Sequence, residues 1–413
     1  MAKVTLGHNL LMRQADLSDR QIVVWMSLAQ LVTWGSVFYT FALLMEPLEQ
    51  ELGMSRAQVS LGFSLALLAE GLLAFPIGRL IDRGFDRWVM AGGSLWVGLC
   101  LMLHSQIDSL WSFYAIWTAL GAGLAATLYT PAFAVVTRRF PQDFRRTIIT
   151  MTFLGGLAST VFIPLSAWLI SELGWRQALL CLAALQFLLC LPIHAVVLRK
   201  PMPALERPVA LPGDAPVAGL RHFIMSAPFL SIATFVMLMM AVTAALPPHL
   251  VSMLRESGLS EAWAIAIPAS IGLLQVVGRL LLYFFERHFD LHLANRLIPW
   301  LIPLGLTALL LSQSRPEVAL LFVLLFGLGN GMLTIVKGTA IAHYVNRDHV
   351  ASLNGALGLP SALARALAPL ALGLLWSSEQ GYQTGIWMLL AASVVAGLAM
   401  WQAQRRSLIP LRS

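Results

Sequence analysis

The chain has 413 residues, of which 58% are hydrophobic and only 11% are charged, against roughly 25% charged residues in soluble domains. This composition excludes an ordinary soluble protein and indicates an all-α integral membrane protein in contact with the lipid bilayer. The formal net charge of +7 does not indicate a nucleic-acid partner, because the basic residues are spread over many short loops instead of one face.

Twelve apolar segments follow one another, each close to or above the roughly 20 residues that cross a bilayer. We predict helices at 22–45, 57–80, 88–106, 111–136, 147–170, 175–198, 226–254, 260–285, 296–314, 317–344, 350–376 and 383–404. Between the sixth and seventh, residues 199–221 hold five prolines and four basic residues, a composition that cannot be buried in lipid. The sequence therefore predicts six-helix bundles at 1–198 and 222–413, joined by a cytoplasmic linker at 199–221.

A short charged motif occurs at the same place in each half. The second segment ends in Gly78-Arg79-Leu80-Ile81-Asp82-Arg83-Gly84-Phe85-Asp86-Arg87, and the eighth ends in Phe285-Glu286-Arg287-His288-Phe289-Asp290. Both contain an acid, an arginine, any residue, a phenylalanine and an aspartate in this order. The repeat indicates two pseudo-symmetric halves.

The distribution of Lys and Arg predicts the orientation. If the N-terminus is cytoplasmic, the loops on that side hold 20 of the 27 basic residues, and the opposite loops hold only Arg56, Arg176, Arg255 and Arg315. The positive-inside rule then places both termini in the cytoplasm, in a cell inner (plasma) membrane. The polar first twenty residues lack an apolar core and a cleavage site, so we expect the first span to act as the membrane signal.

Four ionisable residues lie well inside the predicted spans: Glu70, Arg279, Lys337 and Arg365. A charge in the hydrocarbon region costs at least about 2.5–3.5 kcal/mol, so each needs a partner, a water-filled cavity or a function. Arg279 and Lys337 lie close enough to the inner surface that snorkelling is an alternative. Three positive charges against one negative charge favour a site for an anion.

The two halves, the linker, Gly78-x-Leu80-x-Asp82-Arg83 with its degenerate second copy, and Gly174-Trp175-Arg176 resemble the major facilitator superfamily of secondary transporters. Within it, Gly278-Arg279 and Arg365 are similar to the substrate-anion positions of monocarboxylate porters and oxalate/formate exchangers. The resemblance implies a monomeric carrier of a small organic anion, a mono- or dicarboxylate. It would work by alternating access, with proton coupling or by exchange.

The resemblance also assigns roles to residues. Helices 1, 4, 7 and 10 line the cavity in this family, and helices 2 and 11 meet across the halves. The expected substrate-binding residues are Arg279, Arg365, Lys337, Tyr39, Tyr129, Asn330 and His249. The expected gating residues are Gly78, Asp82, Arg83, Arg87, Arg138, Arg139, Glu286, Arg287 and Asp290. For Tyr39 and Tyr129 simple packing is the alternative, and His249 could be a boundary residue.

Glu70 is the expected proton-coupling residue. It lies about 13 residues from the outer end of its helix, and Arg365 lies about 11 from the outer end of its own, a difference of roughly 3 Å in height. We therefore expect an ion pair, which an arriving carboxylate would break, so that Glu70 takes up a proton. The alternative is a fixed structural bridge.

Other functions are less well supported by the residues. Export of a larger amphiphilic compound, such as a drug or siderophore, is favoured by 13 Trp and 17 Met but opposed by the three buried bases. The spans contain no GxSxG, HExxH or paired catalytic carboxylates, so we predict no enzyme activity. His288 and His292 lack a nearby third ligand, so neither a metal nor a cofactor is expected.

Overall fold

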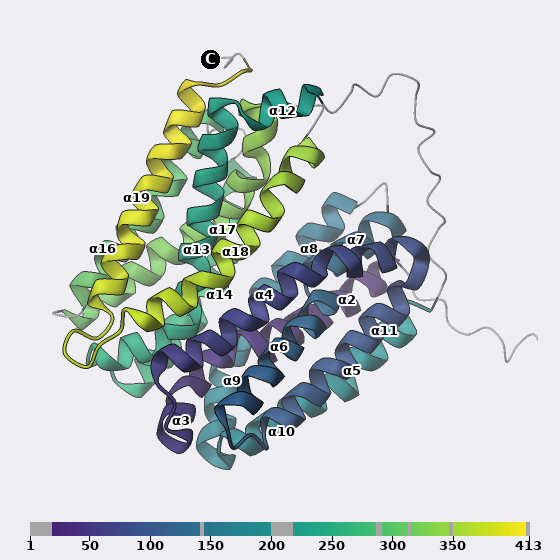
Figure 1. Cartoon of the computed structure of the whole chain (residues 1–413), viewed down its shortest axis with the longest axis vertical. Coiled ribbons are helices and arrows are strands. Elements are labelled where there is room, and N and C mark those ends of the chain that lie inside the picture. Colours follow the sequence, from purple (N-terminus) through teal and green to yellow (C-terminus); the bar gives the residue numbers. More distant parts are fainter. Residues whose placement is uncertain are drawn as a thin grey trace, which may run out of the picture.

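The structure is a computed structural model that describes residues 19–140, 144–199, 218–285, 291–312, 315–346 and 350–409. These residues form helices joined by short turns, and the described residues contain no β-strand. Figure 1 shows two helix bundles side by side, one from the N-terminal half of the chain and one from the C-terminal half.

The N-terminal bundle contains α2 (Asp19–Thr33), η1 (Trp34–Tyr39), α3 (Phe41–Leu52), α4 (Arg56–Leu80), η2 (Ile81–Phe85), α5 (Asp86–His104), α6 (Leu110–Thr127), α7 (Tyr129–Arg139), α8 (Phe144–Gly156), α9 (Ala158–Leu173), α10 (Trp175–Leu185), η3 (Gln186–Cys190) and α11 (Leu191–Val197). The C-terminal bundle contains α12 (Ala218–Ile224), α13 (Ala227–Glu256), α14 (Glu261–Phe285), α15 (Leu291–Leu297), η4 (Ile298–Trp300), α16 (Leu301–Ser312), η5 (Pro316–Val318), α17 (Ala319–Tyr344), α18 (Val350–Leu374) and α19 (Gln383–Arg405).

Eleven helical runs in the described part of the chain are long and apolar enough to cross a membrane. The 49-residue run from Arg56 to His104 contains two spans, because Gly84 has a φ of +90° and turns the chain between α4 and α5. The prediction of twelve spans is therefore confirmed. Several boundaries differ from the prediction: the first span continues to Leu52, for example, and α12 forms within the stretch predicted as the end of the linker. Linker residues 200–217 lie outside the described residues.

Local sequence explains where several helices begin. Gly53 ends α3 in the left-handed conformation, with a φ of +65°. Ser55 then caps α4 in a reciprocal arrangement with Gln58, which satisfies two backbone donors that the helix itself leaves unpaired. Ser109 and Ser112 form the same arrangement at the start of α6. These caps turn the chain sharply between neighbouring spans.

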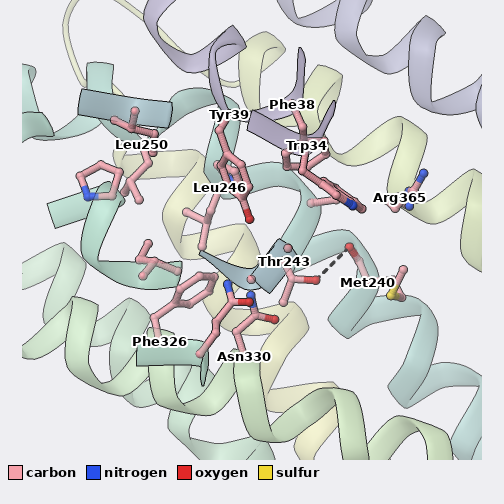
Figure 2. Close-up of a pocket in the computed structure, with 18 of the residues that line it drawn as sticks. Trp34, Phe38, Tyr39, Met240, Thr243, Leu246, Leu250, Phe326, Asn330 and Arg365 are labelled. Carbon is pink, nitrogen blue, oxygen red and sulfur yellow. Dashed lines mark hydrogen bonds between the residues drawn. The ribbon is translucent and has the colours of Figure 1, made fainter. Parts of the chain in front are cut away.

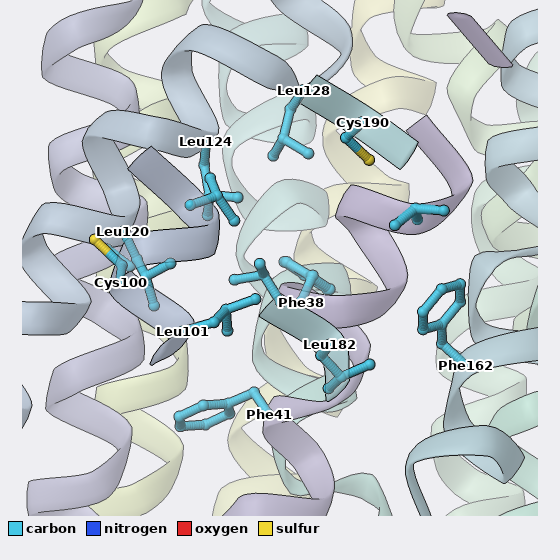
Figure 3. Close-up of a cluster of buried hydrophobic side chains, with 14 of the residues drawn as sticks. Phe38, Phe41, Cys100, Leu101, Leu120, Leu124, Leu128, Phe162, Leu182 and Cys190 are labelled. Carbon is cyan, nitrogen blue, oxygen red and sulfur yellow. The ribbon is translucent and has the colours of Figure 1, made fainter. Parts of the chain in front are cut away.

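Each bundle has its own apolar core. Figure 3 shows part of the N-terminal core, where Phe38 and Phe41 from the first span lie among leucines of α5, α6 and α10. The C-terminal core draws its buried residues from α13 to α19. Because the lipid cannot drive helix association as water does, close approach depends on small residues. A Cβ at Gly373 of α18 would lie 2.4 Å from the hydroxyl of Ser60 in α4.

The halves are tied together at the face that carries the turns at 53–55 and 375–382, here called the closed face. There Arg56 donates to Glu256 at 2.5 Å and to the Tyr382 hydroxyl at 2.9 Å. Arg255 bridges to Glu46 at 2.6 Å. Toward the opposite end, residues 72–80 of α4 and 354–359 of α18 are mostly exposed. That end is here called the open face.

Candidate functional site

A cavity of about 190 Å³ lies between the two bundles. The N-terminal half supplies an aromatic side, and the C-terminal half supplies most of the polar groups (Figure 2). The aromatic side consists of Trp34, Phe38, Tyr39 and Tyr129. The polar groups are those of Thr243, Gln275, Arg279, Asn330 and Arg365. The described residues that line the cavity include no carboxylate.

The aromatic side depends on a wide π-type turn, η1, in the first span. Such turns often occur at functional sites, because they change which side chains share a face. The backbone N–H and the hydroxyl of Thr40 both donate to the carbonyl of Gly35, at 3.1 and 2.9 Å. Ser166 of α9 holds the Thr40 hydroxyl at 2.7 Å. The turn places Trp34, Phe38 and Tyr39 together on the cavity wall.

Two glycines at the end of α8 make room for cavity side chains. A Cβ at Gly155 would lie 2.3 Å from the hydroxyl oxygen of Tyr129. A Cβ at Gly156 would lie 3.4 Å from Nη1 of Arg279. The helix breaks directly afterwards at Leu157, where ψ is 0°. Tyr129 and Arg279 can therefore lie against the backbone of α8.

Arg365 of α18 forms an ion pair with Glu70 of α4 through its Nη2 and the Oε2 of the acid, which confirms the predicted pairing. The contact joins the two bundles, and the side chains are only 19% and 12% exposed. The Nε of Arg365 is buried and has no hydrogen-bond acceptor among the described residues. The guanidinium therefore retains a donor that Glu70 does not use.

Arg279 of α14 also reaches across the bundles. Its Nη1 donates to the carbonyl oxygen of Thr152 in α8 at 2.9 Å. Its Nε, like the Nε1 of Trp34, is buried without an acceptor in the described part of the chain. Together with Arg365, three side chains from three helices line one cavity and each keep a buried N–H without an acceptor among the described residues. An arrangement of this kind can bind a carboxylate, which only accepts hydrogen bonds.

Lys337 and His249 lie outside the cavity wall that the described residues form. The Nζ of Lys337 lies 3.2 Å from the sulfur of Met240, and Met240 itself lines the cavity. His249 is fully buried near the closed face. Its Nδ1 lies 3.0 Å from the Tyr382 hydroxyl, and its Nε2 lies 3.0 Å from the carbonyl oxygen of Pro369. Burial raises the pKa of Tyr382, so this phenol stays protonated. The Nε2 of His249 also lies 3.3 Å from the hydroxyl of Ser60 in the other half, so His249 joins the two halves instead of facing the cavity.

The expected gating residues lie near the open face. Asp82 is 58% exposed, and its carboxylate lies 3.9 Å from Arg138, which also donates to the carbonyl of Ile81 at 2.8 Å. Arg83 is exposed, and Arg87 lies over the ring of Trp88.

The tightest ion pair of this region joins Arg139 to Asp86 at 2.6 Å, with both side chains buried. Sequence reasoning did not assign Asp86 a role, although it lies one turn beyond Asp82. In the second copy of the motif, Glu286, Arg287 and Asp290 lie outside the described residues.

Sequence reasoning also gave Trp34 too little weight. Tyr39 and Tyr129 were among the expected substrate-binding residues, and Trp34 was not. In the structure the rings of Trp34 and Tyr129 are 5.2 Å apart and line the cavity together. The available signal was the i, i+4 spacing of Trp34 and Phe38, which places two aromatic rings on one face of a helix.

Comparison with known proteins agrees with this architecture. Over 306 residues the chain is 28% identical to monocarboxylate transporter 13 of Rattus norvegicus, covering 69% of this chain and 68% of that protein. It is 29% identical over 190 residues to an MFS-type efflux pump of Mycolicibacterium smegmatis, covering 44% of this chain and 43% of the pump.

Solved structures share the fold at low sequence identity. A bacterial homologue of the human drug peptide transporters PepT1 and PepT2 has a TM-score of 0.75 at 13% identity, covering 94% of this chain and 98% of that one. The nucleoside transporter NupG has a TM-score of 0.71 at 15% identity, covering 93% and 99%. The model of the Major Facilitator Superfamily matches residues 26–296. The chain therefore belongs to the Major Facilitator Superfamily and is a multi-pass membrane transporter, not an enzyme.

Proposed function

We propose that the protein transports a small organic anion, a mono- or dicarboxylate, by alternating access of the cavity to the two sides of the membrane. The observation that carries the proposal is that Trp34, Arg279 and Arg365 each keep a buried N–H without an acceptor among the described residues, and that all three side chains line a cavity whose described lining contains no carboxylate. An anion would accept hydrogen bonds from these donors and offset the two guanidinium charges. The similarity to monocarboxylate transporter 13 supports the same substrate class.

The size of the cavity favours a small substrate over a larger amphiphile. Its volume of about 190 Å³ is below the roughly 300–1,000 Å³ of pockets for drug-sized ligands. The similarity to an efflux pump keeps export of an amphiphilic compound as the second candidate.

The ion pair between Arg365 and Glu70 suggests how a proton is coupled to the anion. A carboxylate arriving at the Arg365 guanidinium competes with Glu70 for the same donors. Once Glu70 loses its cation inside the bundle, its ionised form is disfavoured and it takes up a proton. Binding of the anion thereby recruits H⁺, and the two move together. Glu70 as a fixed structural bridge is the alternative.

The distribution of Lys and Arg supports a location in the inner (plasma) membrane of the cell, with both termini on the cytoplasmic side. In that orientation the open face is cytoplasmic. Each chain contains a complete cavity, which supports function as a monomer. The two bundles at 1–198 and 222–413 then rock about the central site, with 199–221 as the linker.

Counterflow in proteoliposomes tests the proposal. Purified protein is reconstituted, and exchange of labelled mono- and dicarboxylates is measured for the wild type, Arg365→Lys and Arg365→Ala. A charged hydrogen bond contributes about 1.5–3 kcal/mol, so Arg365→Ala should weaken apparent affinity at least tenfold. Arg365→Lys should retain part of it, because a point charge replaces a planar fork only imperfectly.

Two controls separate anion binding from loss of folding. The double variant Arg365→Ala/Glu70→Gln avoids an uncompensated buried acid, and it should show the same loss of affinity for carboxylates. Arg296→Ala removes an arginine that lies over the ring of Trp401 and does not line the cavity, so it should transport normally. The proposal is refuted if no carboxylate supports counterflow, or if both Arg365→Ala forms bind carboxylates as the wild type does.

A further inference from the structure

We propose that the transported anion is an aromatic carboxylate, whose ring lies on the aromatic side of the cavity while its carboxylate lies at Arg279 and Arg365. This inference rests on the proposed function, because it takes the binding of a carboxylate as given and assigns the rest of the molecule. It is based on one observation: the N-terminal half contributes aromatic rings to the cavity, and the C-terminal half contributes most of its polar groups.

The aromatic side is continuous. The ring of Trp34 is 5.0 Å from that of Phe38 and 5.2 Å from that of Tyr129, and Phe38 is 5.4 Å from Tyr39. These pairs are tilted or edge-to-face, the arrangements that aromatic rings prefer at centroid distances of about 4.5–7 Å. All four side chains also line the cavity. A fifth ring entering the cavity can join this set in the same geometry.

The opposite side is polar and belongs to the other half. Figure 2 shows the hydroxyl of Tyr39 pointing into the space above Thr243 and Asn330, and the nitrogen of the Trp34 ring on the side toward Arg365. The indole can therefore present its face to a ring and its N–H to the carboxylate attached to that ring. A flat molecule with a charge at one end matches both features.

The aromatic side is held in place before any substrate arrives. Thr40 closes the wide turn on Gly35 and is held by Ser166. Gln186 of η3 donates to the hydroxyl of Ser36 at 2.9 Å, in the same turn. Rings positioned in this way lose little freedom on binding, and preorganisation of this kind increases affinity. A short aliphatic acid can reach the arginines but cannot use the rings.

The first test compares acids on the wild-type protein. Benzoate, cyclohexanecarboxylate and propionate compete for counterflow of a labelled carboxylate in proteoliposomes. Benzoate and cyclohexanecarboxylate have the same charge and ring size, so their difference reports on the aromatic ring. We expect benzoate to bind about three- to tenfold more tightly than cyclohexanecarboxylate. Equal affinity, or a preference for the saturated ring, would overturn the inference.

Variants of Trp34 test which group is responsible. Trp34→Leu should remove the preference for benzoate, and it should weaken propionate only as much as Trp34→Phe does, because both variants lose the indole N–H. Trp34→Phe keeps a ring but loses the N–H, so it should retain the preference while binding all three acids somewhat less tightly. Trp111→Leu is the matched control, because Trp111 is 80% exposed and does not line the cavity; it should behave as the wild type.

The failure modes are distinct. If Trp34→Leu weakens propionate as much as benzoate, the ring assignment is wrong while carboxylate transport stands. If none of the three acids competes in the wild type, and no other carboxylate is exchanged, the proposed function itself is wrong. Should Trp34→Leu not fold, as judged by its thermal unfolding in detergent, the wild-type comparison and Trp34→Phe still decide the question.

Discussion

Glu256→Gln should shift the carrier away from the conformation seen here. Glu256 ends α13 and accepts a hydrogen bond from Arg56 of the other half at 2.5 Å. It also accepts one from the indole N–H of Trp376, within its own half. Glutamine has nearly the same shape but no charge. Arg56 remains bound by both oxygens of Glu49, at 2.6 and 2.7 Å, so the variant weakens the tie between the halves without leaving a buried arginine unpaired.

The size of the shift follows from the exposure of the two side chains. Arg56 is 6% exposed, whereas Glu256 is 34% exposed. A hydrogen bond to a buried charged group contributes about 1.5–3 kcal/mol, and a fully exposed ion pair about 0.2–1 kcal/mol. The contact between Arg56 and Glu256 lies between these two cases, so we expect Glu256→Gln to destabilise the conformation seen here by about 1–2 kcal/mol. That changes the ratio of the two conformations by about 5- to 30-fold.

Distances between spin labels measure this ratio. Labels at the exposed residues Gln50 and Ser378 lie in different halves at the closed face, so a longer distance reports its opening. The matched control is Glu261→Gln, since Glu261 pairs with Arg255 at the same face but within one half. The reasoning fails if Glu256→Gln has the wild-type distance distribution, or if Glu261→Gln opens this face to the same extent.

Three further changes test the coupling, the cavity and the gate. Glu70→Gln should still exchange substrate but no longer concentrate it in response to a pH gradient; accumulation with unaltered pH dependence would return Glu70 to a structural role. Gly155→Ala should displace Tyr129, because the new Cβ would lie 2.3 Å from its hydroxyl, and should lower transport at least severalfold. The control is Gly92→Ala, whose new Cβ would meet no atom of another described element within 4 Å; equal uptake rates for the two variants would contradict the packing argument. Asp82→Asn should weaken closure of the open face and reduce the transport rate without reducing membrane insertion. Because Asp82 is 58% exposed, we expect the loss of its charge to change the stability of this conformation by about 1 kcal/mol or less. An unchanged transport rate would exclude a gating role for Asp82.

Much of the fold could be predicted because the relevant physics is local in the chain. A bilayer requires about 20 apolar residues for each span, so segment lengths predicted the twelve helices. The cost of a buried charge singled out Glu70 and Arg365. The family resemblance implied that the two helices meet, and counting residues placed Glu70 and Arg365 at similar depth; they form an ion pair. Apart from the helix arrangement that the resemblance implied, these inferences needed only the length of each span and the depth of each residue.

The composition of the site depended on the rotation of helices and on contacts between residues far apart in the sequence. The wide turn at Trp34 is held by Ser166 and Gln186, more than 120 residues away. Depth alone did not show that His249 turns toward Tyr382 or that Arg279 binds a carbonyl of the other half. The sequence by itself determined which residues are buried in the membrane, because burial depends on span length and polarity. Only the tertiary structure decided which of them share a cavity, because that depends on how each helix is turned against its neighbours.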